Sequence, residues 1–267
     1  MTARHVPVMT LLAVLLAGHV GTAAAQAEST QQREIEGRAR EAQAAERIAA
    51  LIAAERQRPR LAGIWRVAAP VAALRTEAGE LPPLNAAGRK LLRQRQTAAK
   101  AGRSEDPLQQ CLPPGWPRAL WADAPFLLTQ APAKVTLFHQ HRHLVRHVFL
   151  DGPLQLPADA DPTWEGHHSA RWEAGTLVIE TAGFNGQQWL DAAGLPQSPQ
   201  MRVTEHWRLQ DDGRLAVRVQ IVDPVYYQQP WATTVQFLRQ PEDTELPEEE
   251  CSEALLEYPL RDYAPRE

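Results

Sequence analysis

Short runs in which apolar and polar residues alternate fill the second half of the chain, from about residue 126 to residue 239. An alternation with period two is typical of strands that bury one face. Turn sequences such as Ala174-Gly175 and Asp211-Asp212-Gly213 separate the runs. Strands are predicted over 61–67, 126–130, 135–141, 143–150, 168–172, 176–181, 202–209, 214–222 and 232–239. Because no helix interrupts the last eight, they predict a mainly β fold: an antiparallel meander that forms a lipocalin-like barrel, with a β-sandwich as the alternative.

Two segments before residue 126 have helical character. Residues 29–58 are rich in Ala, Glu and Arg and contain no proline until Pro59, which predicts an exposed or loosely docked N-terminal α-helix. This helix could also support an oligomer. Asn85 is expected to cap a second helix that runs to about Lys100. Between that helix and the strands, residues 102–125 form a connector rich in proline and glycine.

The first 25 residues have the pattern of a secretory signal peptide. Arg4 precedes an apolar run over 9–17, and Ala23-Ala24-Ala25 supplies a cleavage site. The run is too short for a membrane span, although an uncleaved anchor is the alternative. The sequence therefore predicts a periplasmic or secreted protein without a membrane span after cleavage. The predicted parts are a signal peptide over 1–25, a helical extension over 26–60, a β-barrel domain over 61–252 and a C-terminal tail over 253–267.

Composition narrows the classes of partner. The chain is 44% hydrophobic and 22% charged with a net charge of -4, so no basic surface favours nucleic acid.

The only two cysteines are Cys111 and Cys251. In an oxidising compartment they predict a disulfide that closes a loop of about 140 residues, and a pair of free thiols is the alternative.

Two charged residues occupy positions that alternation assigns to the inside of the barrel. Arg146 shares a strand face with Leu144 and Val148, and Glu205 shares one with Val203 and Trp207. A buried charge without a partner would cost several kcal/mol. Arg146 and Glu205 are therefore predicted to pair with each other, to line a ligand pocket, or to do both.

Four of the nine histidines fall within nine residues, His139, His141, His143 and His147. On a strand that runs to residue 141, His139 and His141 would lie on one face and could bind Zn or Cu together with His143. The alternative is a solvated hairpin tip without metal. His167 is a candidate general acid or base near Glu205, with an ordinary histidine of a turn or of the barrel rim as the alternative. The chain lacks a GxSxG nucleophile elbow, a P-loop and a dinucleotide-binding GxGxxG motif.

Several motifs resemble those of a group of exported bacterial proteins of no established activity. They are Trp164-Glu165-Gly166-His167, Arg171-Trp172-Glu173, the run over 176–181, Gly183-Phe184-Asn185, and a stretch over 106–118 with Asp106, Cys111, Pro113, Gly115 and Arg118. Arg146, Glu205 and Cys251 also match. The resemblance covers about residues 61–252. This chain departs from the group at His168, where serine is expected. It also departs over 139–141, where aromatic and acidic residues are expected. The resemblance thus implies a shared site of Arg146, His167 and Glu205.

Together these features predict an exported β-barrel that binds a small organic molecule. Arg146 would orient an anionic or carbonyl group of that ligand. If the protein is an enzyme, His167 and Glu205 would transfer protons in a lyase, isomerase or hydrolase that works without a cofactor. The alternatives are a periplasmic Zn- or Cu-binding protein that uses His139, His141 and His143, and an interaction module that docks a partner through residues 29–58.

Overall fold

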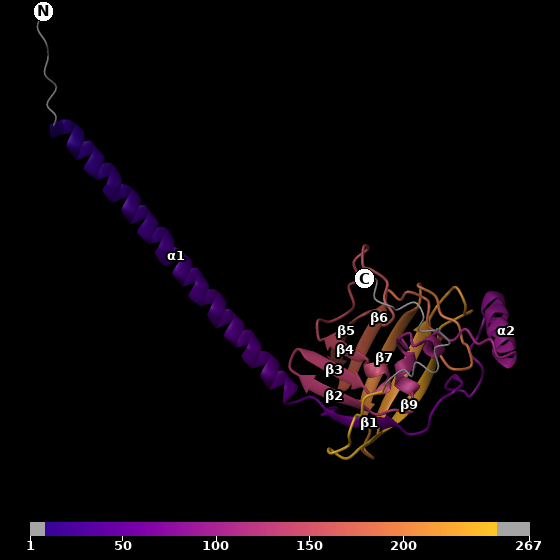
Figure 1. Cartoon of the computed structure of the whole chain (residues 1–267). Helices are drawn as coiled ribbons and strands as arrows, with labels where there is room; N and C mark the ends of the chain where they lie inside the picture. The colour runs from indigo at the N-terminus through magenta and orange to yellow at the C-terminus, as the bar shows by residue number, and fades with distance from the viewer. Residues whose placement is uncertain (1–8, 250–267) are drawn as a thin grey trace, which may run out of the picture. The chain divides into compact units, whose positions relative to one another are not determined.

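The computed structural model describes residues 9–249, which fall into two compact units that divide after Gln57. The first unit is a single helix, α1 (Met9–Glu55) (Figure 1). The predicted start at residue 29 is wrong. No proline occurs between Met9 and Glu55, so nothing in that stretch stops the helix. Within the described part of the chain, no helix combines the length and apolar character that a membrane crossing requires.

The second unit contains nine antiparallel strands in one sheet. They are β1 (Gly63–Val67), β2 (Phe126–Ala131), β3 (Lys134–His139), β4 (Val145–Phe149), β5 (His167–Glu173), β6 (Thr176–Ala182), β7 (Arg202–Leu209), β8 (Leu215–Val222) and β9 (Trp231–Arg239). The order in the sheet is β4-β3-β2-β1-β9-β8-β7-β6-β5. The sheet curls into a nearly closed barrel (Figure 1), which confirms the predicted fold class.

Neighbouring strands pair as the alternating pattern requires. In β8 every second residue is buried, and Val217 and Val219 lie inside the barrel. The β5–β6 hairpin turns through Ala174 and Gly175, whose φ angles of 44° and 80° match the right-handed twist of the two strands. The predicted β7, residues 202–209, agrees with the observed strand at both ends.

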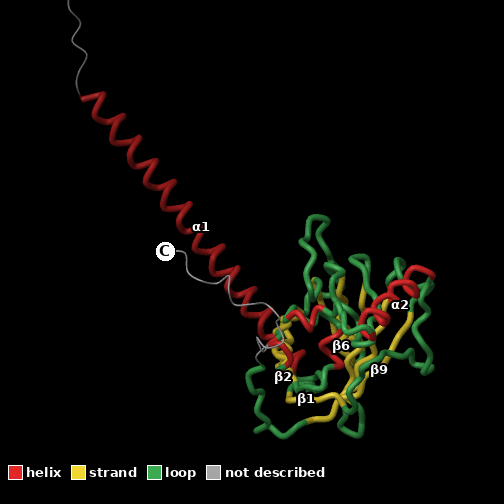
Figure 2. The backbone as a smooth tube through the Cα atoms, turned by 45° about the vertical axis from the view of Figure 1, so that its right-hand side comes forward, coloured by secondary structure: helices red, strands yellow, loops and turns green. Residues whose placement is uncertain are grey.

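The second helix, α2 (Ala86–Lys100), lies outside the barrel, beside the loops (Figure 2). The Asn85 side chain accepts a hydrogen bond from the backbone nitrogen of Gly88, which confirms the predicted cap. Arg95 stacks over the Trp189 ring at 4.8 Å and donates to the Gly194 carbonyl at 3.1 Å, so the helix is fixed to the loop between β6 and β7.

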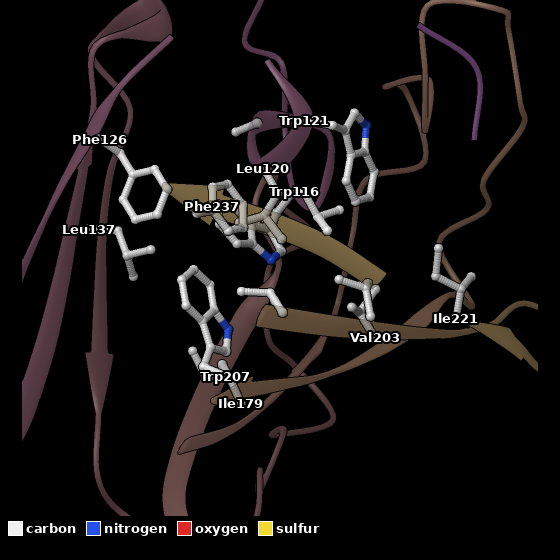
Figure 3. Close-up of a cluster of buried hydrophobic side chains, with 14 of the residues drawn as sticks. Trp116, Leu120, Trp121, Phe126, Leu137, Ile179, Val203, Trp207, Ile221 and Phe237 are labelled. Carbon is white, nitrogen blue, oxygen red and sulfur yellow. The ribbon is translucent and has the colours of Figure 1, made fainter. Parts of the chain in front are cut away.

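The connector between α2 and β2 reaches into the core of the barrel. It contains two short 3₁₀ helices, η1 (Pro107–Gln110) and η2 (Arg118–Trp121). Trp116 and Leu120 pack with strand residues such as Phe126, Trp207 and Phe237 in one continuous cluster (Figure 3). The aromatic rings account for much of the buried apolar area, and this burial holds the irregular connector in place.

Candidate functional site

The barrel has one incomplete side, where β4 and β5 meet. These strands are the two ends of the sheet and have no ladder of backbone hydrogen bonds between them. His168 of β5 instead spans the gap, because its Nε2 donates to the His147 carbonyl of β4 at 2.7 Å. Farther along, the Gly152 nitrogen donates to the Ala170 carbonyl at 3.0 Å. We call this junction the seam.

A cleft of about 620 Å³ opens at the seam, and we call it the seam cleft. Strands β4 and β5, the connector, the turn after β3 and the segment before β5 all contribute to its walls. The lining residues are Cys111, Pro113, Pro114, Arg142, His143, Leu144, Val145, Thr163, Trp164, Glu165, Gly166, His168 and Glu249.

Close backbone contact joins the connector to the segment before β5. The Trp116 nitrogen donates to the Trp164 carbonyl at 3.2 Å. Gly115 has a φ of 68°, and a Cβ atom there would lie 2.7 Å from the same carbonyl oxygen. Glycine is therefore required at this position. The contact brings together the two motif stretches, 106–118 and 164–167, on which the family resemblance depends.

Strained backbone is concentrated at the seam cleft. Among the described residues, four that are not glycine have a left-handed backbone conformation, Cys111, Arg142, His143 and Ala174. The first three line the seam cleft, with φ angles of 57°, 57° and 48°. Cys111 ends η1, Arg142 and His143 lie in the β3–β4 turn, and Ala174 lies in the β5–β6 turn. A residue in this conformation costs on the order of 1 kcal/mol or more, and such residues cluster at binding and active sites.

Two titratable side chains of the seam cleft have shifted pKa values. Burial raises the pKa of the Glu165 carboxyl, although the Arg146 charge opposes the change. Burial and the Arg146 charge lower the pKa of His168 to about 3, so its ring is neutral. Because Nε2 donates to a carbonyl, Nδ1 carries the lone pair, and this buried atom has no hydrogen-bond partner among the described residues.

Arg146 and Glu205 form an ion pair inside the barrel, which confirms the predicted pairing. Arg146 Nη2 lies 2.9 Å from Glu205 Oε1, Arg146 Nη1 lies 3.1 Å from Oε2, and both side chains are 0% exposed. Neither residue lines the seam cleft. The charge of Arg146 nevertheless affects the pKa values of Glu165 and His168 in the seam cleft.

Three side chains that the sequence analysis did not single out complete this pair. Trp116 Nε1 donates to Glu205 Oε1 at 2.6 Å, and Trp207 Nε1 donates to Oε2 at 2.9 Å. Arg146 Nη2 donates to the Thr181 hydroxyl at 2.6 Å, and its guanidinium lies 4.0 Å from the centre of the Trp116 ring. Alternation with Leu177 and Ile179 could have placed Thr181 inside, whereas nothing in the local sequence marks Trp116 as a partner of Glu205.

His167, the predicted acid or base, is separate from Glu205. His168 pairs with Thr181 across the β5–β6 ladder and shares the inner face with it, so the preceding residue, His167, faces outward. Its Nε2 bonds to the Asp161 carbonyl at 2.7 Å. The structure thus places His168, not His167, on the inner side of the barrel, as alternation with Ala170 and Trp172 could have indicated.

The three predicted metal ligands are not brought together. The expected strand to residue 141 is wrong, because β3 ends at His139 and the chain turns through the 3₁₀ segment η3 (His141–His143). His139 is buried and stacks on Phe126 at 4.7 Å, and burial, together with Arg146, lowers its pKa to about 3. In the described part of the chain, no three His, Cys, Asp or Glu side chains form a group that could hold a metal ion.

His141 and His143 instead contact Glu249. The Glu249 carboxylate lies 3.1 Å from His141 Nδ1 and accepts from the Arg142 nitrogen at 3.0 Å. The Glu249 nitrogen donates to His143 Nε2 at 3.0 Å. Cys111 lines the seam cleft, and Cys251 lies outside the described residues, so the Cys111–Cys251 disulfide stays a prediction.

A scan against models of protein families finds no match to this chain, and a search of curated proteins finds no significant relative. The resemblance to exported bacterial proteins therefore stays a prediction. What the seam cleft does has to be inferred from its own residues.

Proposed function

We propose that this protein is a small-molecule-binding β-barrel whose ligand occupies the seam cleft. The observation that carries the proposal is the coincidence of three strained residues, Cys111, Arg142 and His143, with the one incomplete side of the barrel. A strained backbone persists only where its surroundings hold it, and binding sites are the usual place. The volume of about 620 Å³ suits a small organic molecule.

The lining also supports this proposal. Pro113, Pro114, Leu144, Val145 and Trp164 offer apolar surface. Glu165 and His168 place a few polar atoms among them, which is the usual composition of a ligand site. Arg146 acts on the ligand through its charge rather than by contact, because its guanidinium is fully buried against Glu205.

If the ligand is converted chemically, Glu165 is the group best suited to transfer a proton. Its carboxyl lines the cleft, and burial raises its pKa toward the range in which a carboxyl acts as an acid. His168 stays neutral, with Nδ1 as an acceptor. This chemistry corresponds to a lyase, isomerase or hydrolase without a cofactor, with Glu165 in place of the predicted His167 and Glu205.

The proposal includes export, cleavage near residue 25 and a Cys111–Cys251 disulfide. The intact mass of protein purified from the periplasm or medium tests all three. We expect the mature chain without residues 1–25 and a mass two hydrogens below the value after reduction. A full-length mass, or no change on reduction, would contradict export or the disulfide, respectively.

Binding in the seam cleft is tested with the neutral fluorescent probe N-phenyl-1-naphthylamine. Val145→Trp places a bulky ring in the cleft, whereas Phe149→Trp makes a similar change on the same outward face of β4, outside the lining. We expect Val145→Trp to weaken probe binding at least tenfold and Phe149→Trp to leave it unchanged.

Circular dichroism should show that both variants are folded. Equal probe affinity in the two variants, or no binding by the unsubstituted protein, would contradict the proposed site.

A further inference from the structure

The turn after β3 presents two hydrogen-bond donors to one carboxylate group. Glu249 Oε2 lies 3.1 Å from His141 Nδ1 and 3.0 Å from the Arg142 nitrogen, and Oε1 lies 3.2 Å from the same His141 atom. A carboxylate only accepts hydrogen bonds, so both nitrogens donate. The left-handed conformation of Arg142 and His143 shapes the turn that presents these donors.

Glu249 belongs to a segment that borders the seam cleft and is not part of the barrel. It follows β9 by ten residues and also lines a second cleft of about 680 Å³ that lies beside Arg118 and Gln140. The side chain thus forms a wall shared by the two clefts, with His141 on the second cleft and Arg142 on the seam cleft. Residues 244–249 form neither a strand nor a helix.

The surroundings of the turn extend the site for an anionic ligand with an apolar body. Arg142 is half-buried, its Nη2 donates to the Leu108 carbonyl at 2.9 Å, and its buried Nε has no partner among the described residues. Leu144 and Val145 follow directly in the chain and line the seam cleft. Donors for a carboxylate therefore lie next to apolar walls.

We infer that the ligand of the seam cleft is an organic carboxylate with an apolar body, and that Glu249 occupies the carboxylate position in its absence. The inference depends on the proposed function, because it names the ligand class of the same cleft. The incoming carboxylate replaces Glu249 on His141 Nδ1 and the Arg142 nitrogen, and its apolar part lies along Leu144, Val145 and Trp164. Glu249 thus competes with the ligand from within the chain.

The test compares octanoate with octan-1-ol as displacers of bound N-phenyl-1-naphthylamine. The variant is Glu249→Ala, and the matched control is Glu248→Ala, which changes the adjacent exposed carboxylate outside the cleft. We expect Glu249→Ala to improve octanoate affinity at least tenfold and octanol affinity less than twofold, with no change in the control. Adding His141→Phe to Glu249→Ala should remove most of the octanoate gain.

Each other outcome decides against the inference. An equal gain for octanoate and octanol would mean that the variant only widens the cleft, and the same gain in Glu248→Ala would indicate a general charge effect. No gain for either compound would show that Glu249 does not compete. All three results leave the proposed function intact, whereas failure of the probe to bind, or to respond to Val145→Trp, would contradict the proposed function itself.

Discussion

The Arg146–Glu205 pair and the seam cleft use the same kinds of residue in opposite ways. In the pair, both carboxylate oxygens of Glu205 have partners, two of them indole nitrogens, and no atom of either side chain reaches solvent. In the seam cleft, the buried Nδ1 of His168 has no partner among the described residues, burial raises the pKa of Glu165, and three residues are strained. Near-complete hydrogen bonding serves stability, whereas unused polar atoms beside an open volume serve binding.

The comparison also shows how a buried charge can matter at a site that it does not touch. Arg146 is fully covered by Trp116, Thr181 and Glu205. In the low-dielectric interior its charge still acts on Glu165 and His168, because screening by water is weak there. The interior pair therefore sets part of the electrostatic environment of the cleft.

The largest expected effect is on the interior pair. Arg146→Ala leaves the Glu205 carboxylate buried without its cation, which should lower the free energy of unfolding by about 3 to 5 kcal/mol. Arg171→Ala is the matched control, because Arg171 is also an arginine in ion pairs, with Glu173 and Glu180, but on the outer face of the barrel. Arg171→Ala should lower the free energy of unfolding by about 1 kcal/mol or less. Urea denaturation measures both.

A similar cost for Arg146→Ala and Arg171→Ala would contradict the distinction between the two regions. If Arg146→Ala does not fold, Arg146→Lys keeps the charge without the fork of donors and should fall between the control and the alanine variant.

A smaller effect is expected from acid. The pKa of His139 falls from about 6.5 when unfolded to about 3 in the folded barrel, so the unfolded chain binds more protons below pH 6.5. The histidine contribution to stability is therefore intact above pH 6.5 and is lost as pH falls toward 3. At pH 5 the loss amounts to about 2 kcal/mol for this residue.

His139→Phe keeps a ring against Phe126 and removes the titration. The decrease in unfolding free energy between pH 7 and pH 5 should be about 2 kcal/mol smaller in this variant than in the unsubstituted protein. His147→Phe, at an exposed position of β4, should leave the decrease unchanged. Parallel pH profiles for His139→Phe and the unsubstituted protein would show that burial does not hold His139 neutral.

Local patterns were sufficient to predict much of the fold. Alternation gave β7 at its full length, and the capping preference of Asn85 gave the start of α2. The inward assignment of Arg146 and Glu205 came from the same alternation, because a period of two fixes which residues share a face. These features depend on residues that are near one another in the chain.

The seam cleft could not be predicted in this way. Its walls come from Pro113, Val145 and Trp164, which the fold brings together from distant parts of the chain. The turn over 140–143 has no glycine, proline, asparagine or aspartate to mark it, so alternation alone carried the predicted strand two residues too far. That error placed His141 on the same strand face as His139.

The unpaired seam has a mechanical consequence. A barrel with a slit between two strands twists and widens more easily than a closed barrel, because the ladder of hydrogen bonds does not run around its full circumference. Here the His168 side chain, the two bonds of Gly152 to Ser169 and Ala170, and the interior Arg146–Thr181 bond stand in place of a whole ladder. Few bonds therefore oppose a change in the width of the slit, and the cleft lies along it.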